Sequence, residues 1–193
     1  MSHFFAYLAR MKYIKRWGLM RNTQEENIQE HSLQVAQIAH ALCLLRNRRF
    51  GGGADARRAC ELALFHEAAE VITGDLATPI KYFDEEITTS YKRIENVASG
   101  ILLNMLPEDL RLDYKPLLLE MHEDPEWPRV KAADKLCAYL KCVQEIAAGN
   151  AEFSKAIKSI KADIDERAQQ LPEVGAFLEE FCPSFSLTLD ELN

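Results

Sequence analysis

Apolar residues recur at intervals of three and four positions along most of the chain, and this spacing constrains the fold more than any other feature. Val35, Ile38, Leu42 and Leu45 form one such stripe, with the spacing of side chains on one face of an α-helix. Alternating apolar and polar residues rich in β-branched side chains, the pattern of strands, are almost absent. The sequence therefore predicts an all-α fold.

Helix ends can be placed from capping and turn residues. Thr23 with Glu26 three positions later has the pattern of a capping box, and Asp55 after the three glycines at 51–53 has the pattern of an N-cap. Those glycines lack the lysine and hydroxyl residue of a phosphate-binding loop. Further helices are expected over roughly 3–16, 84–105, 108–120, 127–148 and 151–170, and the C-terminal tail is expected to be irregular.

Length and composition narrow the class of protein. A chain of 193 residues suits one domain, so we expect residues 1–193 to form a single domain. The net charge of -7 argues against a nucleic-acid polymer as partner. Five cysteines without a C-x-x-C pair indicate reduced thiols in a cytoplasmic protein. Charges interrupt every apolar stretch near the N-terminus, which predicts neither a signal peptide nor a membrane span.

Polar residues interrupt two of the apolar stripes. His31 lies four positions before Val35, so it shares the buried face of its helix. In the segment "LFHEAAEVITGD", His66 continues a stripe of small and apolar residues, with Glu67 and Glu70 beside it. A hydrogen-bonded core histidine is the alternative for His31, and a solvated helix face is the alternative for both glutamates.

A third interruption lies in "VKAADKLCAYLKC". Asp134 has Val130 four positions before it and Cys137 three positions after it, so it also lies on an apolar face. An aspartate there needs a partner, either a metal ion or a lysine such as Lys131 or Lys135. Two imidazoles and two carboxylates from three helices form a mixed nitrogen and oxygen set suited to one divalent ion. Glu70 is then a candidate general acid or base.

At these residues the sequence resembles the HD-domain metal-dependent phosphohydrolases, whose signature is H...HD...D. The segments "RWGLMRN", "ENIQEHSLQVA", "TGDLATPIKYF" and "AYLKCVQEIAAGN" resemble more closely the bacterial 5'-deoxynucleotidases, over nearly the whole chain. The resemblance implies an HD-domain helical bundle, a homodimer and one catalytic divalent ion, often cobalt or manganese. It also implies a deoxyribonucleoside 5'-monophosphate substrate, hydrolysed to the deoxyribonucleoside and phosphate.

The resemblance also assigns roles to individual residues. It places the metal ligands at His31, His66, Glu67 and Asp134, and the catalytic glutamate at Glu70. Arg16 matches the residue that orients the phosphate, and Trp17 the residue that closes on the sugar. The nucleoside is contacted by the segment Asp75, Leu76, Ala77 and Thr78, while His31, Glu67 and Asp134 also border the substrate.

The residues themselves leave alternatives open for these substrate contacts. Arg16 and Trp17 could be a surface pair near a helix end, with an amphipathic tryptophan. Gly74 followed by Asp75 could simply be a helix stop and a turn.

Two departures from the family pattern bear on activity. The family has His-Asp where this chain has His66-Glu67. The extra carbon moves the carboxylate by roughly 1.5 Å, whereas ligand distances tolerate about 0.2 Å. Ala77 stands where the family has proline, which loosens the loop. The alternatives are a nucleotide-binding protein with impaired catalysis, an HD phosphohydrolase for a cyclic or triphosphorylated nucleotide, and a helical scaffold.

Overall fold

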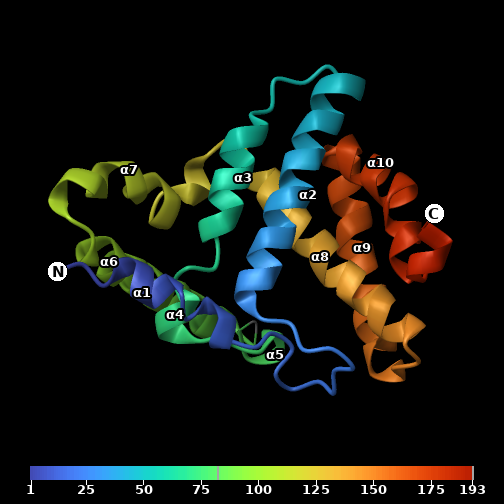
Figure 1. The fold of residues 1–193 in the computed structure, drawn as a ribbon, viewed down its shortest axis with the longest axis horizontal. Coiled ribbons are helices and arrows are strands. Elements are labelled where there is room, and N and C mark those ends of the chain that lie inside the picture. Colours follow the sequence, from blue (N-terminus) through green and yellow to red (C-terminus); the bar gives the residue numbers. More distant parts are fainter. Residues whose placement is uncertain (82, 193) are drawn as a thin grey trace. The chain divides into compact units, whose positions relative to one another are not determined.

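The computed structural model describes residues 1–81 and 83–192, and helices account for its regular secondary structure (Figure 1). Within these residues the only β pairing is an isolated antiparallel bridge between Lys15 and Asn27. The predicted all-α fold is therefore confirmed. None of the helices in the described ranges is both long and apolar enough to cross a membrane.

The helices differ in several places from the predicted ranges. The expected helix over 3–16 is confined to α1 and a 3-10 turn, η1. An additional helix, α10, begins at Pro172, after the predicted helix over 151–170. The tail forms short 3-10 turns. In chain order the elements are α1 (Phe4–Leu8), η1 (Met11–Tyr13), α2 (Ile28–Arg49), α3 (Ala56–Phe65), α4 (Glu70–Thr73), α5 (Thr78–Lys81), α6 (Glu85–Met105), α7 (Glu108–Leu118), η2 (Met121–Glu123), α8 (Trp127–Ala147), η3 (Ala151–Phe153), α9 (Ser154–Gln170), α10 (Pro172–Glu180), η4 (Cys182–Ser186) and η5 (Leu189–Leu192).

The chain divides into two compact units, of which the first comprises Met1–Met20, Glu25–Leu33 and Leu64–Asp124. In this unit α6 packs against α1, α4 and α7 (Figure 1). Phe4 is fully buried, and its ring meets the Tyr114 ring edge-on at a centroid distance of 5.2 Å. Ala68, Leu102, Leu106 and Leu118 complete the buried cluster. Burial of this apolar surface stabilises the segment that carries His66 and Glu67.

The second unit comprises Arg21–Gln24, Gln34–Ala63 and Pro125–Asn193. Helix α9 packs against both α8 and α10, and α8 also contacts η3 and η4. The predicted stripe of Val35, Ile38, Leu42 and Leu45 is buried, as is the α8 face that carries Val130, Ala133, Leu136, Cys137 and Leu140. The helical spacing therefore identified the core residues of α2 correctly.

Buried ion pairs also hold the second unit together. Arg129 donates from Nε to Glu173 at 2.8 Å and from Nη1 to Glu126 at 2.8 Å. Glu173 is fully buried, and the Glu126 side chain is 8% exposed. The backbone N–H of Asp55 donates to the other oxygen of Glu126 at 2.8 Å. Such carboxylates tolerate burial because their oxygens have charged or hydrogen-bonded partners.

Candidate metal centre

A short antiparallel pairing places Arg16 and Trp17 beside the start of α2. The N–H of Arg16 donates to the carbonyl of Glu26 at 2.9 Å, and the N–H of Ile28 donates to the carbonyl of Ile14 at 3.1 Å. Trp17 follows with φ of 58°, in the left-handed region where bulky residues are uncommon. This conformation turns the chain directly after Arg16.

Helix α2 starts four residues later than the predicted capping box. Asn27 Oδ1 accepts hydrogen bonds from the N–H groups of Gln29 at 3.1 Å and Glu30 at 3.0 Å, the bonding of an N-cap. The predicted cap at Thr23 is wrong, because its N–H and hydroxyl donate instead to the buried carboxylate of Glu145, at 2.9 and 2.8 Å. A tertiary contact has replaced the local one.

His31 lies in the first turn of α2 and is 1% exposed. Its position one turn before Val35 gives it the buried orientation that the apolar spacing predicted. Its Nδ1 lies 3.7 Å from Glu26 Oε1, and its Nε2 lies 3.6 Å from Glu67 Oε1. The two ring nitrogens therefore face different carboxylates.

The sequence pattern predicted one continuous helix through His66, Glu67 and Glu70. In the structure these three residues do not share a helix. Helix α3 ends at Phe65, and α4 begins at Glu70. Between them the N–H of Ala68 donates to the carbonyl of Phe65 at 2.9 Å, and that of Glu70 to Glu67 at 3.0 Å. These bonds span three residues rather than four, so the chain tightens into turns. Tertiary contacts of Glu67 and burial of Ala68 override the helical preference of this segment.

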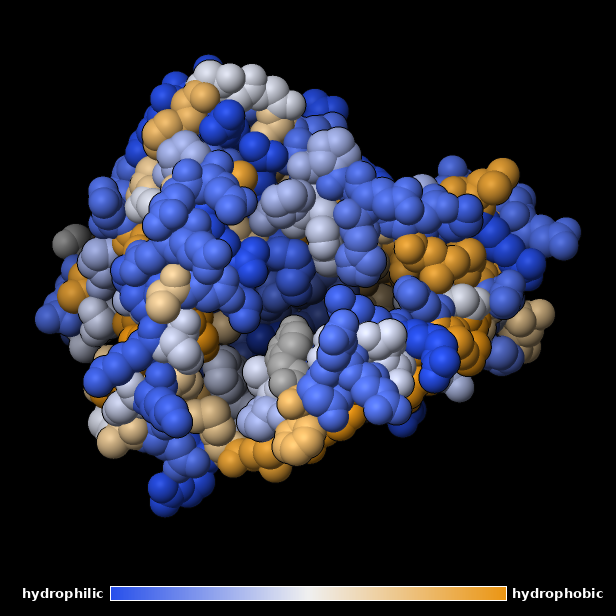
Figure 2. Space-filling model, turned by 180° about the vertical axis from the view of Figure 1, so that it is seen from behind, coloured by the Kyte–Doolittle hydropathy of each residue, from blue (hydrophilic) through white to orange (hydrophobic). Residues whose placement is uncertain are grey.

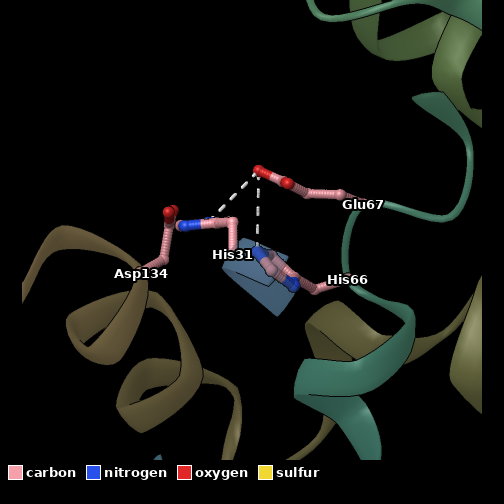
Figure 3. Close-up of side chains that lie close together, drawn as sticks. All are labelled: His31, His66, Glu67 and Asp134. Atoms are coloured by element: carbon pink, nitrogen blue, oxygen red, sulfur yellow. Dashed lines mark ion pairs between the residues drawn. The ribbon is translucent and has the colours of Figure 1, made fainter. Parts of the chain in front are cut away.

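The turn brings Glu67 to both histidines. Glu67 Oε1 lies 3.6 Å from His31 Nε2 and 3.7 Å from His66 Nε2 (Figure 3). The two imidazole rings are 5.4 Å apart at their centroids, and one ligand atom from each of the three residues lies within 4.8 Å of the others. Ligands of one ion at about 2.1 Å stand roughly 3 to 4.2 Å apart, so a small adjustment of these side chains fits a divalent ion.

The same Glu67 oxygen also carries an ion pair. Arg16 Nη1 donates to Glu67 Oε1 at 2.7 Å, and both side chains are at most 14% exposed. Arg16 Nε additionally lies 3.2 Å from Glu26 Oε2. Arg16, the predicted phosphate-binding residue, is therefore in direct contact with Glu67, a predicted metal ligand.

Glu70 is 7% exposed, and its Oε2 is buried without a hydrogen-bond partner. Burial, together with the nearby negative charges of Glu67 and Asp75, raises the pKa of Glu70 to about 9, against a smaller opposing effect of Arg16. A carboxyl group with this pKa is protonated at neutral pH. A divalent cation beside Glu67 would act in the opposite direction and lower it.

The segment after Glu70 starts with the turn that the Gly-Asp pair predicted. Gly74 has φ of 73° and caps α4, and its N–H donates to the Glu70 carbonyl at 2.8 Å. Asp75 and Thr78 are exposed, whereas Leu76 and Ala77 are partly buried. Thr78 begins the short helix α5. Contact of these four residues with a nucleoside stays a prediction.

Asp134 lies on α8, in the second compact unit. Its side chain is 15% exposed, between the buried residues Val130 and Cys137. Lys131 Nζ donates to Asp134 Oδ2 at 2.7 Å, so the predicted alternative of a lysine partner is present. Lys135 instead pairs with Asp163 at 3.3 Å. A carboxylate has two oxygens, so an ion pair with Lys131 is compatible with a role as metal ligand.

Comparison with known proteins places the chain in a family. A model of the family described as 5'-deoxynucleotidase YfbR-like matches residues 3–185. The 5'-deoxynucleotidase of Vibrio cholerae is 53% identical over 100% of this chain and 98% of its own length. The 5'-deoxynucleotidase YfbR of Escherichia coli is 52% identical over 100% of this chain and 96% of its own length.

A solved structure supports the same fold. The crystal structure of an HD-domain phosphohydrolase from Listeria innocua superposes with a TM-score of 0.79 at 26% identity, covering 95% of this chain and 88% of the other. The predicted HD-domain helical fold is thereby confirmed. Family model, relatives and fold agree across almost the whole length, and the chain belongs to the YfbR-like family of HD-domain 5'-deoxynucleotidases.

Proposed function

We propose that this protein is a metal-dependent 5'-deoxynucleotidase, which hydrolyses deoxyribonucleoside 5'-monophosphates to deoxyribonucleosides and phosphate. One observation carries the proposal beyond family membership. His31, His66 and Glu67 each direct a ligand atom to a common point, with the atoms within 4.8 Å of one another. Buried polar groups that converge in this way are suited to binding a cation.

The proposed ligand set is His31, His66, Glu67 and Asp134. Asp134 is included because an aspartate on the apolar face of α8 matches the last position of the family signature. The mixed nitrogen and oxygen donors suit several divalent ions, of which we favour Co²⁺ or Mn²⁺. When bound, the ion would polarise the phosphate and activate water as a nucleophile.

The remaining residues act on the phosphate and on protons. Arg16 offers a planar fork of donors to two phosphate oxygens and neutralises charge that develops on them. Glu70, beside this group and shielded from water, exchanges a proton with the attacking water or with the leaving 5'-oxygen. Trp17 forms a rigid wall against the deoxyribose, and Asp75, Leu76, Ala77 and Thr78 contact the nucleoside.

Phosphate release from dAMP, with and without added Co²⁺ or Mn²⁺, tests this proposal. We expect metal-dependent release that is lost in Glu70→Ala and after treatment with a chelator. A panel of dNMP, NMP, dNTP and cyclic nucleotides then defines the substrate. Release of pyrophosphate or triphosphate, or hydrolysis of cyclic nucleotides alone, would refute the proposal.

One contact favours a second candidate function, a nucleotide-binding protein with impaired catalysis. The Arg16–Glu67 ion pair, at 2.7 Å, engages both the phosphate-binding group and a metal ligand. A pair of this strength competes with the metal and with the phosphate. Binding of dAMP without metal-dependent turnover would support this candidate over the first.

A homodimer and a cytoplasmic location complete the proposal. Ile94, Val97 and Ile101 follow one another at helical spacing along α6 and are 52, 58 and 44% exposed, a stripe that a second copy would cover. Hydrophobic side chains gather along the lower edge of the face in Figure 2. The five cysteines, all of them among the described residues, form no disulfide, which agrees with a reducing compartment. Sedimentation equilibrium of the wild type and of Val97→Glu tests the dimer, which the added charge should weaken.

A further inference from the structure

Glu26 contacts three residues of the proposed site, although the sequence pattern assigned it only to a helix cap. Its Oε2 accepts a hydrogen bond from Trp17 Nε1 at 3.0 Å and lies 3.2 Å from Arg16 Nε. Its Oε1 lies 3.7 Å from His31 Nδ1. The Glu26 side chain is 14% exposed, so these contacts are largely shielded from water.

We propose that Glu26 is a positioning residue, whose single carboxylate orients the metal-ligating imidazole of His31 together with the phosphate-binding Arg16 and the sugar-facing Trp17. The inference rests on the proposed function, and it adds a residue that neither the motif nor the ligand set contains. Its two oxygens are directed to these three side chains, so the role that we assign to Glu26 is to orient them.

The contact with His31 would favour one ring nitrogen as the metal ligand. With Nδ1 directed to Glu26 and Nε2 directed to Glu67, a proton on Nδ1 leaves the Nε2 lone pair available for the ion. At 3.7 Å the carboxylate is an ion-pair neighbour of this nitrogen. A small closure to hydrogen-bonding distance on metal binding would make the imidazole a stronger ligand and fix its ring plane. Glu26 would therefore raise metal affinity without binding the metal.

The contacts of Glu26 with Arg16 and Trp17 fix the orientation of these two side chains. The Trp17 backbone lies in the left-handed region, with φ of 58°, a conformation that persists only where the surroundings hold it. The indole N–H and the Arg16 Nε both meet the same Glu26 oxygen. Anchoring through Nε leaves the Nη groups of the guanidinium to reach Glu67 or a phosphate.

Glu26 does not serve as a helix cap, which separates this role from an ordinary structural one. Asn27 supplies the side-chain bonds to the first turn of α2. The neighbouring Glu25 is a matched contrast, since its side chain is 73% exposed and its carboxylate pairs with Lys15 at the surface. Two adjacent glutamates thus differ in burial and in what they orient.

The test compares Glu26→Gln with Glu25→Gln in the purified full-length protein. Co²⁺ affinity is measured by visible absorption in competition with a chelator, and thermal melting confirms the fold. We expect Glu26→Gln to bind Co²⁺ about 10 to 100 times more weakly, the range for loss of a partner behind a ligating histidine. Glu25→Gln should match the wild type in Co²⁺ affinity and dAMP hydrolysis.

Kinetics add a readout that a purely structural role would not produce. Glu26→Gln and Trp17→Phe, which removes the indole N–H, should each raise KM for dAMP, and the double variant should raise it by less than the product of the two factors. If Glu26→Gln unfolds, Glu26→Asp, which draws the charge back by about 1.5 Å, replaces it.

The outcomes distinguish the two proposals. A folded Glu26 variant with wild-type Co²⁺ affinity and independent effects on KM would overturn this inference alone. A wild-type protein that neither binds Co²⁺ nor hydrolyses dAMP would overturn the proposed function, and the inference with it.

Discussion

Replacing Glu70 by glutamine should stabilise the metal-free protein, by an amount that depends on pH. Burial raises the pKa of Glu70 from 4.5 to about 9 in the folded state, so between these values the folded protein binds a proton that the unfolded chain has lost. Stability contributed by this group therefore falls as pH rises through that window. At pH 7 the protein has lost folding stability in proportion to the difference between pH 7 and the unfolded pKa of 4.5. This difference of about 2.5 pKa units corresponds to about 3 kcal/mol.

Glutamine has the shape of the protonated acid and no such cost. In urea unfolding with a chelator present, we expect Glu70→Gln and the wild type to be similar near pH 4.5 and to differ by about 3 kcal/mol at pH 7, or roughly 6 to 12 °C in Tm. The control is Glu61→Gln, an α3 glutamate whose side chain is 50% exposed, which should change stability by less than about 1 kcal/mol. A Glu70→Gln difference that does not grow between pH 5 and 8 would refute the reasoning.

Three further changes test the ion pairs. Glu67→Asp withdraws the carboxylate from Arg16 by about 1.5 Å, so KM for dAMP should fall by about tenfold as the arginine is released to the phosphate; steady-state kinetics with an unchanged or higher KM would contradict this. Arg129→Met removes the cation that the buried carboxylates of Glu126 and Glu173 share, and it should cost about 3 to 5 kcal/mol in urea unfolding. Arg49→Met, at a surface pair, should change stability far less. Equal costs would contradict the burial argument. Burial opposes the charge of Glu145, but the Lys141 ammonium and hydrogen bonds from neighbouring groups outweigh it and lower the pKa of Glu145 to about 2. The stability that this charge contributes is therefore complete above pH 4.5 and is lost as pH falls through 2. Glu145→Gln should cost at least about 3 kcal/mol at pH 7 and progressively less in acid-unfolding titrations below pH 4.5, and a cost independent of pH would exclude the charge as its source.

Apolar periodicity predicted the long helices and the buried orientation of His31, because both depend on residues three and four positions apart. It could not predict where α3 ends. The segment from His66 to Ala69 has no glycine or proline to stop a helix, and its turns depend on contacts with Arg16 and with the core around Phe4, which are remote in sequence. Such tertiary effects override local preference.

The cap of α2 illustrates the same limit in another form. Thr23 and Glu26 had the spacing of a capping box, yet Thr23 bonds to Glu145, which is 122 positions away. Glu26 meets Arg16, which lies ten positions before it, through a two-segment pairing that the sequence did not indicate. A local motif therefore gave Glu26 a local role, whereas the long-range contacts place it beside His31.

The carboxylates around Arg16 lower the stability of the folded, metal-free chain. The same negative charges favour the binding of a cation. Glu26 and Glu67 both contact the one guanidinium, and Glu70 lies close enough to Glu67 for its pKa to rise. Without a metal, protonation of Glu70 reduces the net negative charge of this cluster. A divalent ion between His31, His66 and Glu67 would reverse the local potential, release that proton and free Arg16 from part of its attraction to Glu67. Metal binding, proton release and phosphate binding would then be coupled through Glu67, which is the residue that departs from the family signature.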